Sequence, residues 1–242
     1  MLKFQDGAML PIDHIPMSHQ DLGLLSAAFV RLGFFVAPPA EFRSPDTPGE
    51  VWPSRGVFLE RGWFDLQEAS AAPADRPAVP GSCLFLASDL ESATRALAPM
   101  KLDPPFRLTR HWADARPGPQ LSMAFANLRA RVAPFMLAVI AYDAPGSDVD
   151  AAWRRHPNTA LEILGPGFPD PSPGPAAEDA ARVLDLSGFR YGMGGLAVRI
   201  RVEDLDRVIG CLEAGQLEFT RGGLEIHVPP FGALGCAFVF SA

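Results

Sequence analysis

This 242-residue chain has only three cysteines, no long apolar run and no excess of basic residues. Cys83, Cys211 and Cys236 are odd in number and lie in apolar segments, so we expect small buried side chains rather than disulfides or a metal cluster. No apolar stretch reaches the ~18 residues of a membrane-spanning helix. The net charge of −7 argues against non-specific binding to nucleic-acid phosphates. The first residues also lack the apolar core of a signal peptide, so the sequence predicts a cytoplasmic protein without nucleic-acid or membrane partners.

Several common catalytic motifs are missing as well. The sequence contains no Gly-x-Ser-x-Gly motif and no Cys-x-x-Cys motif. A glycine-rich segment at 192–195 precedes an expected strand rather than a helix, so it does not have the context of a phosphate-binding loop.

What the chain does contain is a recurring unit, seen first in residues 12–36. An apolar strand carrying His14 is followed by Asp21, which has the side chain and charge preferred at a helix N-cap. Apolar residues then recur at three- and four-residue spacing, as on the buried face of one helix: Leu22, Leu25, Phe29 and Leu32. Gly33 stands where a left-handed helix stop is expected, and a new strand follows.

The unit repeats along the chain. An apolar strand, an Asp-Leu pair and a helix recur in 81–98 and in 196–215, where Gly215 is the expected stop. The Asp-Leu pairs begin at 21, 89 and 204, and the second interval is nearly twice the first, which predicts a poorer copy between them. We place its strand at 159–165 and its helix at 176–186, with its later strands lost. The expected division is a first pair of units in 1–147 and a second, shortened pair in 148–242.

The segments between these units are predicted to be strands or loops. The proline-rich segment 37–53 is expected to be a surface loop, because proline cannot donate to a strand ladder. The remaining strands are expected at 55–61, 63–69, 107–113, 121–129, 135–142, 218–219, 224–228 and 236–240.

Five motifs give the chain a resemblance to a known family: DHI at 13–15, DL at 21–22, LGF at 32–34, GWFDLQE at 62–68 and HPN at 156–158. In this pattern the sequence resembles the glyoxalase-like branch of the vicinal oxygen chelate superfamily. The resemblance implies an α+β fold of paired βαβββ modules, whose curled mixed sheets surround an open cup. The third module is expected to be truncated.

The resemblance also implies a site in the cup. His14 falls on the first-strand histidine ligand of the family, and Asp65 falls on the carboxylate ligand at the end of the first module, with Glu68 further along. Both carboxylates are candidates for acid–base catalysis. The two other ligand positions are occupied by Ser82 and Tyr142. The implied cofactor is one divalent ion (Zn, Ni, Mn or Fe), or none where the ligand set is incomplete.

Each candidate residue also has a purely structural interpretation. His14 is either a ligand in the cup or a hydrogen-bonded core histidine. Asp65 alternates with Phe64 and Leu66, so it points either into the cup or to solvent. The other candidate ligand-binding residues could instead serve packing, strand ends and turns: Trp63, His111, Tyr142, His156 and Asn158.

Two classes of function remain at this stage. The first is a glyoxalase-like enzyme with lyase, isomerase or dioxygenase-type chemistry on a small oxygenated organic molecule. The alternative is a non-catalytic, resistance-type protein that binds a small molecule in a cup with a degenerate metal site. Because the modules can pair within one chain, a monomer or loose homodimer is expected.

Overall fold

The computed structural model describes residues 2–4, 9–71, 73, 75–96, 101–113, 121–132, 135–143, 149–169, 184–185, 189–190 and 193–242. Its helices are α1 (Leu22–Arg31), α2 (Leu90–Ala96), the short 3-10 helix η2 (Ala151–Arg154) and α4 (Leu205–Ala214). Its strands are β1 (Leu2–Phe4), β2 (Met9–Leu10), β3 (Ile12–His19), β4 (Pro39–Arg43), β5 (Val51–Phe58), β6 (Trp63–Glu68), β7 (Ser82–Leu86), β8 (Phe106–Trp112), β9 (Leu121–Val132), β10 (Phe135–Tyr142), β11 (Ala160–Gly167), β12 (Leu184–Asp185), β13 (Ala197–Val202), β14 (Thr220–Gly222), β15 (Glu225–Val228) and β16 (Ala237–Ser241).

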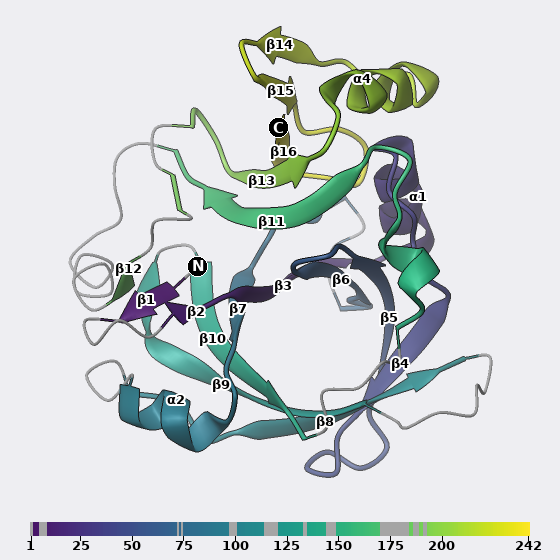
Figure 1. Ribbon diagram of the computed structural model, residues 1–242. Coiled ribbons are helices and arrows are strands. Elements are labelled where there is room, and N and C mark those ends of the chain that lie inside the picture. The colour runs from purple at the N-terminus through teal and green to yellow at the C-terminus, as the bar shows by residue number, and fades with distance from the viewer. Residues whose placement is uncertain are drawn as a thin grey trace.

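Two βαβββ modules close into one barrel. The first runs β3-α1-β4-β5-β6 and the second β7-α2-β8-β9-β10. Within each module the first and last strands pair in parallel, β3 with β6 and β7 with β10. The modules join through the antiparallel pairs β3·β7 and β4·β8, which gives the closed order β10-β7-β3-β6-β5-β4-β8-β9. Figure 1 shows this barrel nearly end-on, so the α+β fold of paired modules is confirmed.

The C-terminal part of the chain forms a second curled sheet in the order β11-β13-β16-β15-β14. Strands β13 to β16 with α4 repeat the βαβββ module, and β11 lies antiparallel to β13 as β3 lies antiparallel to β7. The helix predicted at 176–186 falls mostly outside the described residues. Its described part is wrong, because Leu184–Asp185 is strand β12, paired with β1. The division of the chain at residue 147 stays a prediction.

The core has two parts, on either side of the barrel wall. The larger lies outside the barrel, where α1 and the second sheet cover the first module (Figure 1). At its centre the ring of Phe29 lies 5.1 to 5.6 Å from the rings of Phe34, Phe64 and Phe238. The smaller part is associated with the barrel interior. It contains the aromatic residues Phe42, Phe58, Trp63 and Trp153 together with aliphatic residues and Met123. The barrel interior is therefore partly filled, which limits any ligand to the space that remains.

The helices begin and end close to where the sequence predicts. The Asp21 carboxylate accepts from the Leu24 backbone N–H at 2.9 Å, and Asp204 accepts from the N–H of Asp206 at 2.8 Å. Gly33 has a φ of +84°, which confirms the left-handed stop after α1. Gly215 instead has a φ of −76°. It is needed there because a Cβ would lie 2.3 Å from the carbonyl oxygen of Arg31.

The loop predicted at 37–53 is wrong in part, because β4 (Pro39–Arg43) is a barrel strand between β5 and β8. The two prolines of this segment that lie in strands, Pro39 and Pro53, are at positions where only one neighbouring strand pairs. Pro39 precedes the β8 pairing, which begins at Ala40, and Pro53 of β5 precedes the β6 pairing, which begins at Ser54. A missing N–H costs little at such a position, so proline content alone could not exclude a strand.

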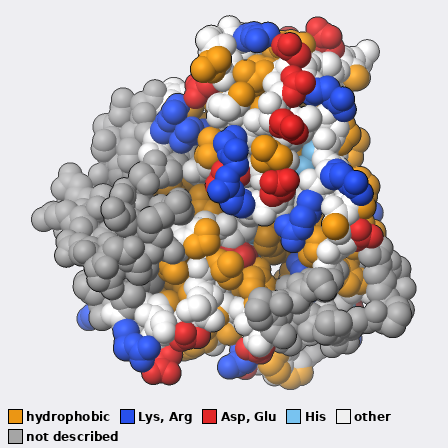
Figure 2. Space-filling model, viewed as in Figure 1, with side chains coloured by type: hydrophobic (Ala, Val, Ile, Leu, Met, Phe, Trp, Pro, Cys, Tyr) orange, Lys and Arg blue, Asp and Glu red, His pale blue; other side chains and the backbone are white. Residues whose placement is uncertain are grey.

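The surface is mixed in charge. On the described part of the face in Figure 2, Lys and Arg side chains alternate with Asp and Glu, without a continuous basic area. Among the described residues, no helix has the length and apolar character needed to cross a membrane.

Candidate functional site

A β-bulge in β3 defines the site. Ile12 pairs with Phe85 of β7, and His14 pairs with Leu84, so two steps along β3 match one step along β7. A bulge of this kind turns a side chain away from the face that strict alternation would give it. Asp13 and His14 thereby reach the same group of polar side chains, although they are neighbours in sequence.

The buried Asp13 carboxylate is the centre of that group. Its Oδ2 atom accepts from Nδ1 of His14 at 2.6 Å, from the Tyr142 hydroxyl at 2.7 Å and from Nε1 of Trp63 at 3.2 Å. A carboxylate can only accept, so the proton on His14 is fixed at Nδ1. The Trp63 ring lies 4.5 Å from the His14 ring and fixes its plane. Among the described residues, none bonds to the remaining ring nitrogen, Nε2.

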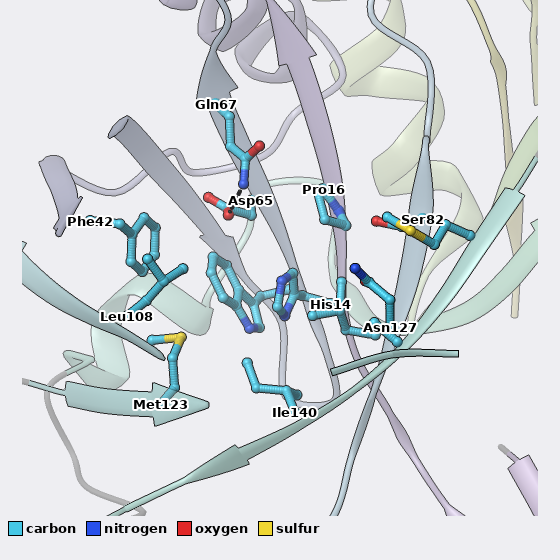
Figure 3. Close-up of a pocket in the computed structure, with 14 residues that line it drawn as sticks. His14, Pro16, Phe42, Asp65, Gln67, Ser82, Leu108, Met123, Asn127 and Ile140 are labelled. Carbon is cyan, nitrogen blue, oxygen red and sulfur yellow. Dashed lines mark hydrogen bonds between the residues drawn. The ribbon is translucent and has the colours of Figure 1, made fainter. Parts of the chain in front are cut away.

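His14 lines a cavity of about 210 Å³ inside the barrel (Figure 3). Its polar lining residues come from β3, β6, β7 and β9. Its apolar lining residues come mainly from β4, β8, β9 and β10. The described lining is His14, Pro16, Phe42, Trp63, Asp65, Gln67, Ser82, Leu84, Leu108, Met123, Asn127, Met136, Ala138 and Ile140. We call this space the first cavity. His14, Trp63, Asp65 and Ser82 thus lie around one space, and their role as site residues stays a prediction.

Asp65 shares the first cavity but has its own partners. One carboxylate oxygen accepts from the Ser54 hydroxyl and the other from Nε2 of Gln67 at 2.6 Å. The side chain is buried and points into the barrel, as Figure 3 shows. The carboxylate bonded to His14 is thus Asp13, which sequence reasoning missed because alternation places adjacent side chains on opposite faces. An aspartate inside an apolar strand, next to a histidine, was the available signal.

A second cavity, of about 540 Å³, shares Trp63 with the first and is lined by Asp13, Arg110 and Tyr142 among others. Burial, and next the nearby negative charge of Asp13, raise the pKa of Tyr142 well above its usual value, so its hydroxyl stays a donor. The Arg110 guanidinium lies 5.0 to 5.3 Å from the rings of Phe58, Trp63 and Trp112. Tyr142, which the sequence placed at a ligand position, thus supports Asp13 from the second cavity.

Four other candidates line neither cavity. Glu68 is exposed at the end of β6, and His111 is half-buried on β8. His156 accepts from the Phe35 N–H at Nδ1 (3.0 Å) and donates to the Phe58 carbonyl from Nε2 (2.8 Å). Asn158 donates to the Leu32 carbonyl at 2.9 Å, at the end of α1. His156 and Asn158 therefore tie the start of the second sheet to the first module.

The environment of His156 leads to a pH-dependent stability. Burial lowers the pKa of His156 to about 4 from 6.5, and the hydrogen bond to Phe58 only partly opposes this. The folded state therefore holds His156 neutral, and its stability should fall as pH drops from about 6.5 to about 4. The total loss is about 3 kcal/mol. Urea unfolding at pH 7, 5.5 and 4.5 measures it.

His156→Gln should flatten this pH dependence, whereas His227→Gln, at a partly exposed position on β15, should change it much less. Equal slopes in all three proteins would show that His156 does not hold its depressed pKa.

The donor set does not fit a divalent metal centre. Among the described residues, no group of three His, Cys, Asp or Glu side chains is placed to hold an ion. His14 offers one nitrogen and Asp65 one carboxylate, and Ser82 occupies the third family position. Metal sites in proteins typically use three or more strong protein ligands with supporting hydrogen bonds. The ligand pair His14 and Asp65, expected from the resemblance, therefore lies in one cavity, and the described residues around it do not complete a metal site.

We accordingly expect no stoichiometric metal binding. Protein purified without a metal-chelating tag should contain well under one equivalent of Zn, Ni, Mn or Fe by elemental analysis. Added ions should not raise its melting temperature. A rise of several degrees with one ion, abolished by His14→Gln, would contradict this expectation.

Comparisons with known proteins identify the fold. No protein-family model and no curated protein sequence matches the chain. A solved structure of a xylose isomerase-like TIM barrel/4-hydroxyphenylpyruvate dioxygenase fusion protein is similar over 96% of this chain and 48% of its own, with a TM-score of 0.55 and 9% identity. A 4-hydroxymandelate synthase variant from Streptomyces coelicolor matches 96% of this chain and 93% of its own, with a TM-score of 0.44 and 12% identity. A methylmalonyl-CoA epimerase in complex with methylmalonyl-CoA and NH4+ matches 57% of this chain and 97% of its own, with a TM-score of 0.38 and 15% identity. At such identities the likeness concerns the fold alone.

Proposed function

We propose that this chain is an enzyme of the vicinal oxygen chelate fold that moves a proton on a small oxygenated organic molecule in the first cavity. The observation that carries the proposal is the Asp13–His14 pair, joined at 2.6 Å, on the wall of that cavity. A buried carboxylate that fixes an imidazole beside a cavity is a common arrangement for general acid–base catalysis. Dioxygenase chemistry is not part of the proposal, because it would need the metal centre that these residues do not complete.

In this proposal each residue of the pair has a distinct role. With the proton held at Nδ1 by Asp13, Nε2 of His14 is the basic nitrogen. It takes a proton from a carbon next to a carbonyl group, and the electron pair of that C–H bond moves onto the carbonyl oxygen. The Asp13 carboxylate stabilises the imidazolium that forms. When that carbon also carries a hydroxyl group, return of the proton to the former carbonyl carbon completes an isomerisation, because the hydroxyl proton passes to the negatively charged oxygen and the hydroxyl-bearing carbon becomes the new carbonyl.

Other residues of the cavity suit the second half of this reaction. The Ser82 hydroxyl and the Asn127 amide line the first cavity and can donate to the oxygen on which negative charge develops. Apolar side chains cover the opposite wall, including Leu108, Met123 and Ile140. A dry wall facing a few polar groups strengthens each electrostatic interaction in the cavity.

The proposal is tested with 2-hydroxyacetophenone, an α-hydroxy ketone with exchangeable hydrogens next to its carbonyl. In D2O the protein should accelerate loss of the CH2 proton signal, followed by 1H NMR. Binding without exchange would favour the non-catalytic alternative, and absence of both binding and exchange would overturn the proposal.

A further inference from the structure

The two cavities occupy successive layers of one barrel. On three strands the lining passes from the first cavity to the second within two residues. These steps are Leu84 to Leu86 on β7, Leu108 to Arg110 on β8 and Ile140 to Tyr142 on β10. Residues two apart on a strand face the same side and are about 7 Å apart. The two cavities are therefore consecutive along the barrel axis, one layer of side chains apart.

One residue of the described lining belongs to both layers, and it is Trp63 on β6. Its ring lies 4.5 Å from the ring of His14, which lines the first cavity. On the side of the second cavity it stacks on the ring of Phe58 at 5.2 Å. The Trp63 indole therefore lies between the two cavities and forms a wall that separates them.

This wall is held in place on several sides. Nε1 of Trp63 donates to the Asp13 carboxylate at 3.2 Å, and the Arg110 guanidinium lies 5.3 Å from the centre of the Trp63 ring. With the rings of His14 and Phe58 also packed against it, the side chain is only 7% exposed. All of these contacts would be lost if the indole turned away, so the wall is a fixed part of the packed barrel and not a movable gate.

The lining residues also set the direction in which a substrate of the proposed reaction lies. Its carbonyl oxygen lies near Ser82, which is one inward position further from the second cavity than Leu84. Figure 3 shows Ser82 on one side of His14 and Ile140 on the other. The apolar body of the substrate therefore extends past His14 toward the end of the first cavity that Trp63 closes.

From this placement we propose that Trp63 determines the specificity of the proposed reaction by limiting the length of the substrate's apolar body. The inference rests on the proposed function and deepens it, because it names what the same site excludes. A single ring ends against the indole, inside the first cavity of about 210 Å³. A longer, biaryl body would have to take the place of the indole in order to reach the second cavity, of about 540 Å³.

Removal of the indole should turn this limit into a new binding space. A large side chain deleted from a core leaves an apolar cavity, and such cavities take up aromatic molecules of matching size. The second ring of a biaryl ketone would then pack where the indole was. There it contacts the ring of Phe58 and the guanidinium of Arg110, the same two groups that now contact Trp63.

Two α-hydroxy ketones that differ by one ring test the inference: 2-hydroxyacetophenone and 2-hydroxy-4′-phenylacetophenone. Hydrogen exchange in D2O is followed by 1H NMR, and the quantity compared is the ratio of kcat/KM for the long ketone to kcat/KM for the short one. In wild type the long ketone should react about 100-fold or more slowly, because a fixed wall leaves no room for its second ring. Trp63→Ala should raise the ratio about 100-fold or more.

Trp63→Ala also removes a donor to Asp13, so its rate with the short ketone should fall, and the ratio corrects for this loss. Tyr142→Phe is the matched control, because it removes another donor to Asp13 and leaves the Trp63 wall in place. Its rates should fall with both ketones, while their ratio stays that of wild type. Trp63→Leu keeps an apolar side chain in the core, so it serves as a second variant if alanine unfolds the barrel. It should raise the ratio about tenfold or more.

The outcomes separate this inference from the proposed function. If wild type exchanges both ketones equally well, or if the folded Trp63 variants keep the wild-type ratio, the inference is overturned and the proposed function stands. If no protein exchanges either ketone, the proposed function falls, and isothermal titration calorimetry then tests whether Trp63 limits ligand length. The long ketone should bind Trp63→Ala about tenfold or more tightly than it binds wild type. Equal binding to both proteins, or binding to neither, would overturn the inference as well.

Discussion

Glutamine in place of His14 is expected to slow the exchange of 2-hydroxyacetophenone hydrogens 10²- to 10⁴-fold, the usual contribution of a positioned general base. Glutamine keeps a polar side chain of similar length, and its amide N–H can still donate to Asp13. It has no basic nitrogen to present to the cavity. The loss should therefore appear in the rate constant for exchange, while binding of 2-hydroxyacetophenone changes much less.

A matched control is His227→Gln on β15, because His227 is partly exposed in the second sheet and does not line the first cavity. Its exchange rate should equal that of wild type. The exchange rate of Asp13→Asn should lie between those of His14→Gln and His227→Gln, because an amide can no longer fix the Nδ1 proton or stabilise the imidazolium. A wild-type rate in His14→Gln would remove His14 from the reaction.

Alanine in place of Phe29 should destabilise the protein by about 3–5 kcal/mol, the range for a large aromatic side chain deleted from a core. Phe29 is fully buried on α1 and contacts Phe64 of the barrel and Phe238 of the second sheet. The deletion leaves a cavity where α1, the barrel and the second sheet meet. For a chain of this length each kcal/mol lowers Tm by about 2–4 °C, so the expected drop is roughly 6–20 °C.

Urea unfolding followed by circular dichroism measures this loss. Leu24→Ala is the control on the same helix, because Leu24 is 58% exposed. It should cost less than about 0.5 kcal/mol, as surface substitutions usually do. Because Phe29 joins the barrel to the second sheet, both should unfold in one transition in wild type. A Phe29→Ala protein with wild-type stability would show that this junction carries little of the packing energy.

The sequence was most informative where structure depends on near neighbours. The caps at Asp21 and Asp204, the stop at Gly33 and the apolar stripe of α1 are all present as expected. Each depends on contacts within a few residues, which the local order of side chains encodes. The repeat of these local signals predicted the recurring units, and the family resemblance predicted that they pair.

The sequence was least informative where a residue's role depends on a distant partner. The prolines around β4 are compatible with a strand only because of where β5, β6 and β8 begin to pair. His156 resembled a site residue, but both of its ring nitrogens bond to backbone groups. One partner is the N–H of Phe35, between α1 and β4, and the other is the carbonyl of Phe58, at the end of β5. No local pattern specifies such pairings.

The sequence by itself determined the repeated units and their helix ends. The family resemblance added His14 and Asp65 as predicted site residues, and both lie on strands of one barrel. Only the tertiary structure decided that Asp13, and not Asp65, bonds to His14. The reason is physical: alternation would separate adjacent side chains, and the bulge that brings them together exists only because β3 pairs with β7 out of step. The same pairing of distant strands placed Arg110 on the second cavity and Asn127 on the first.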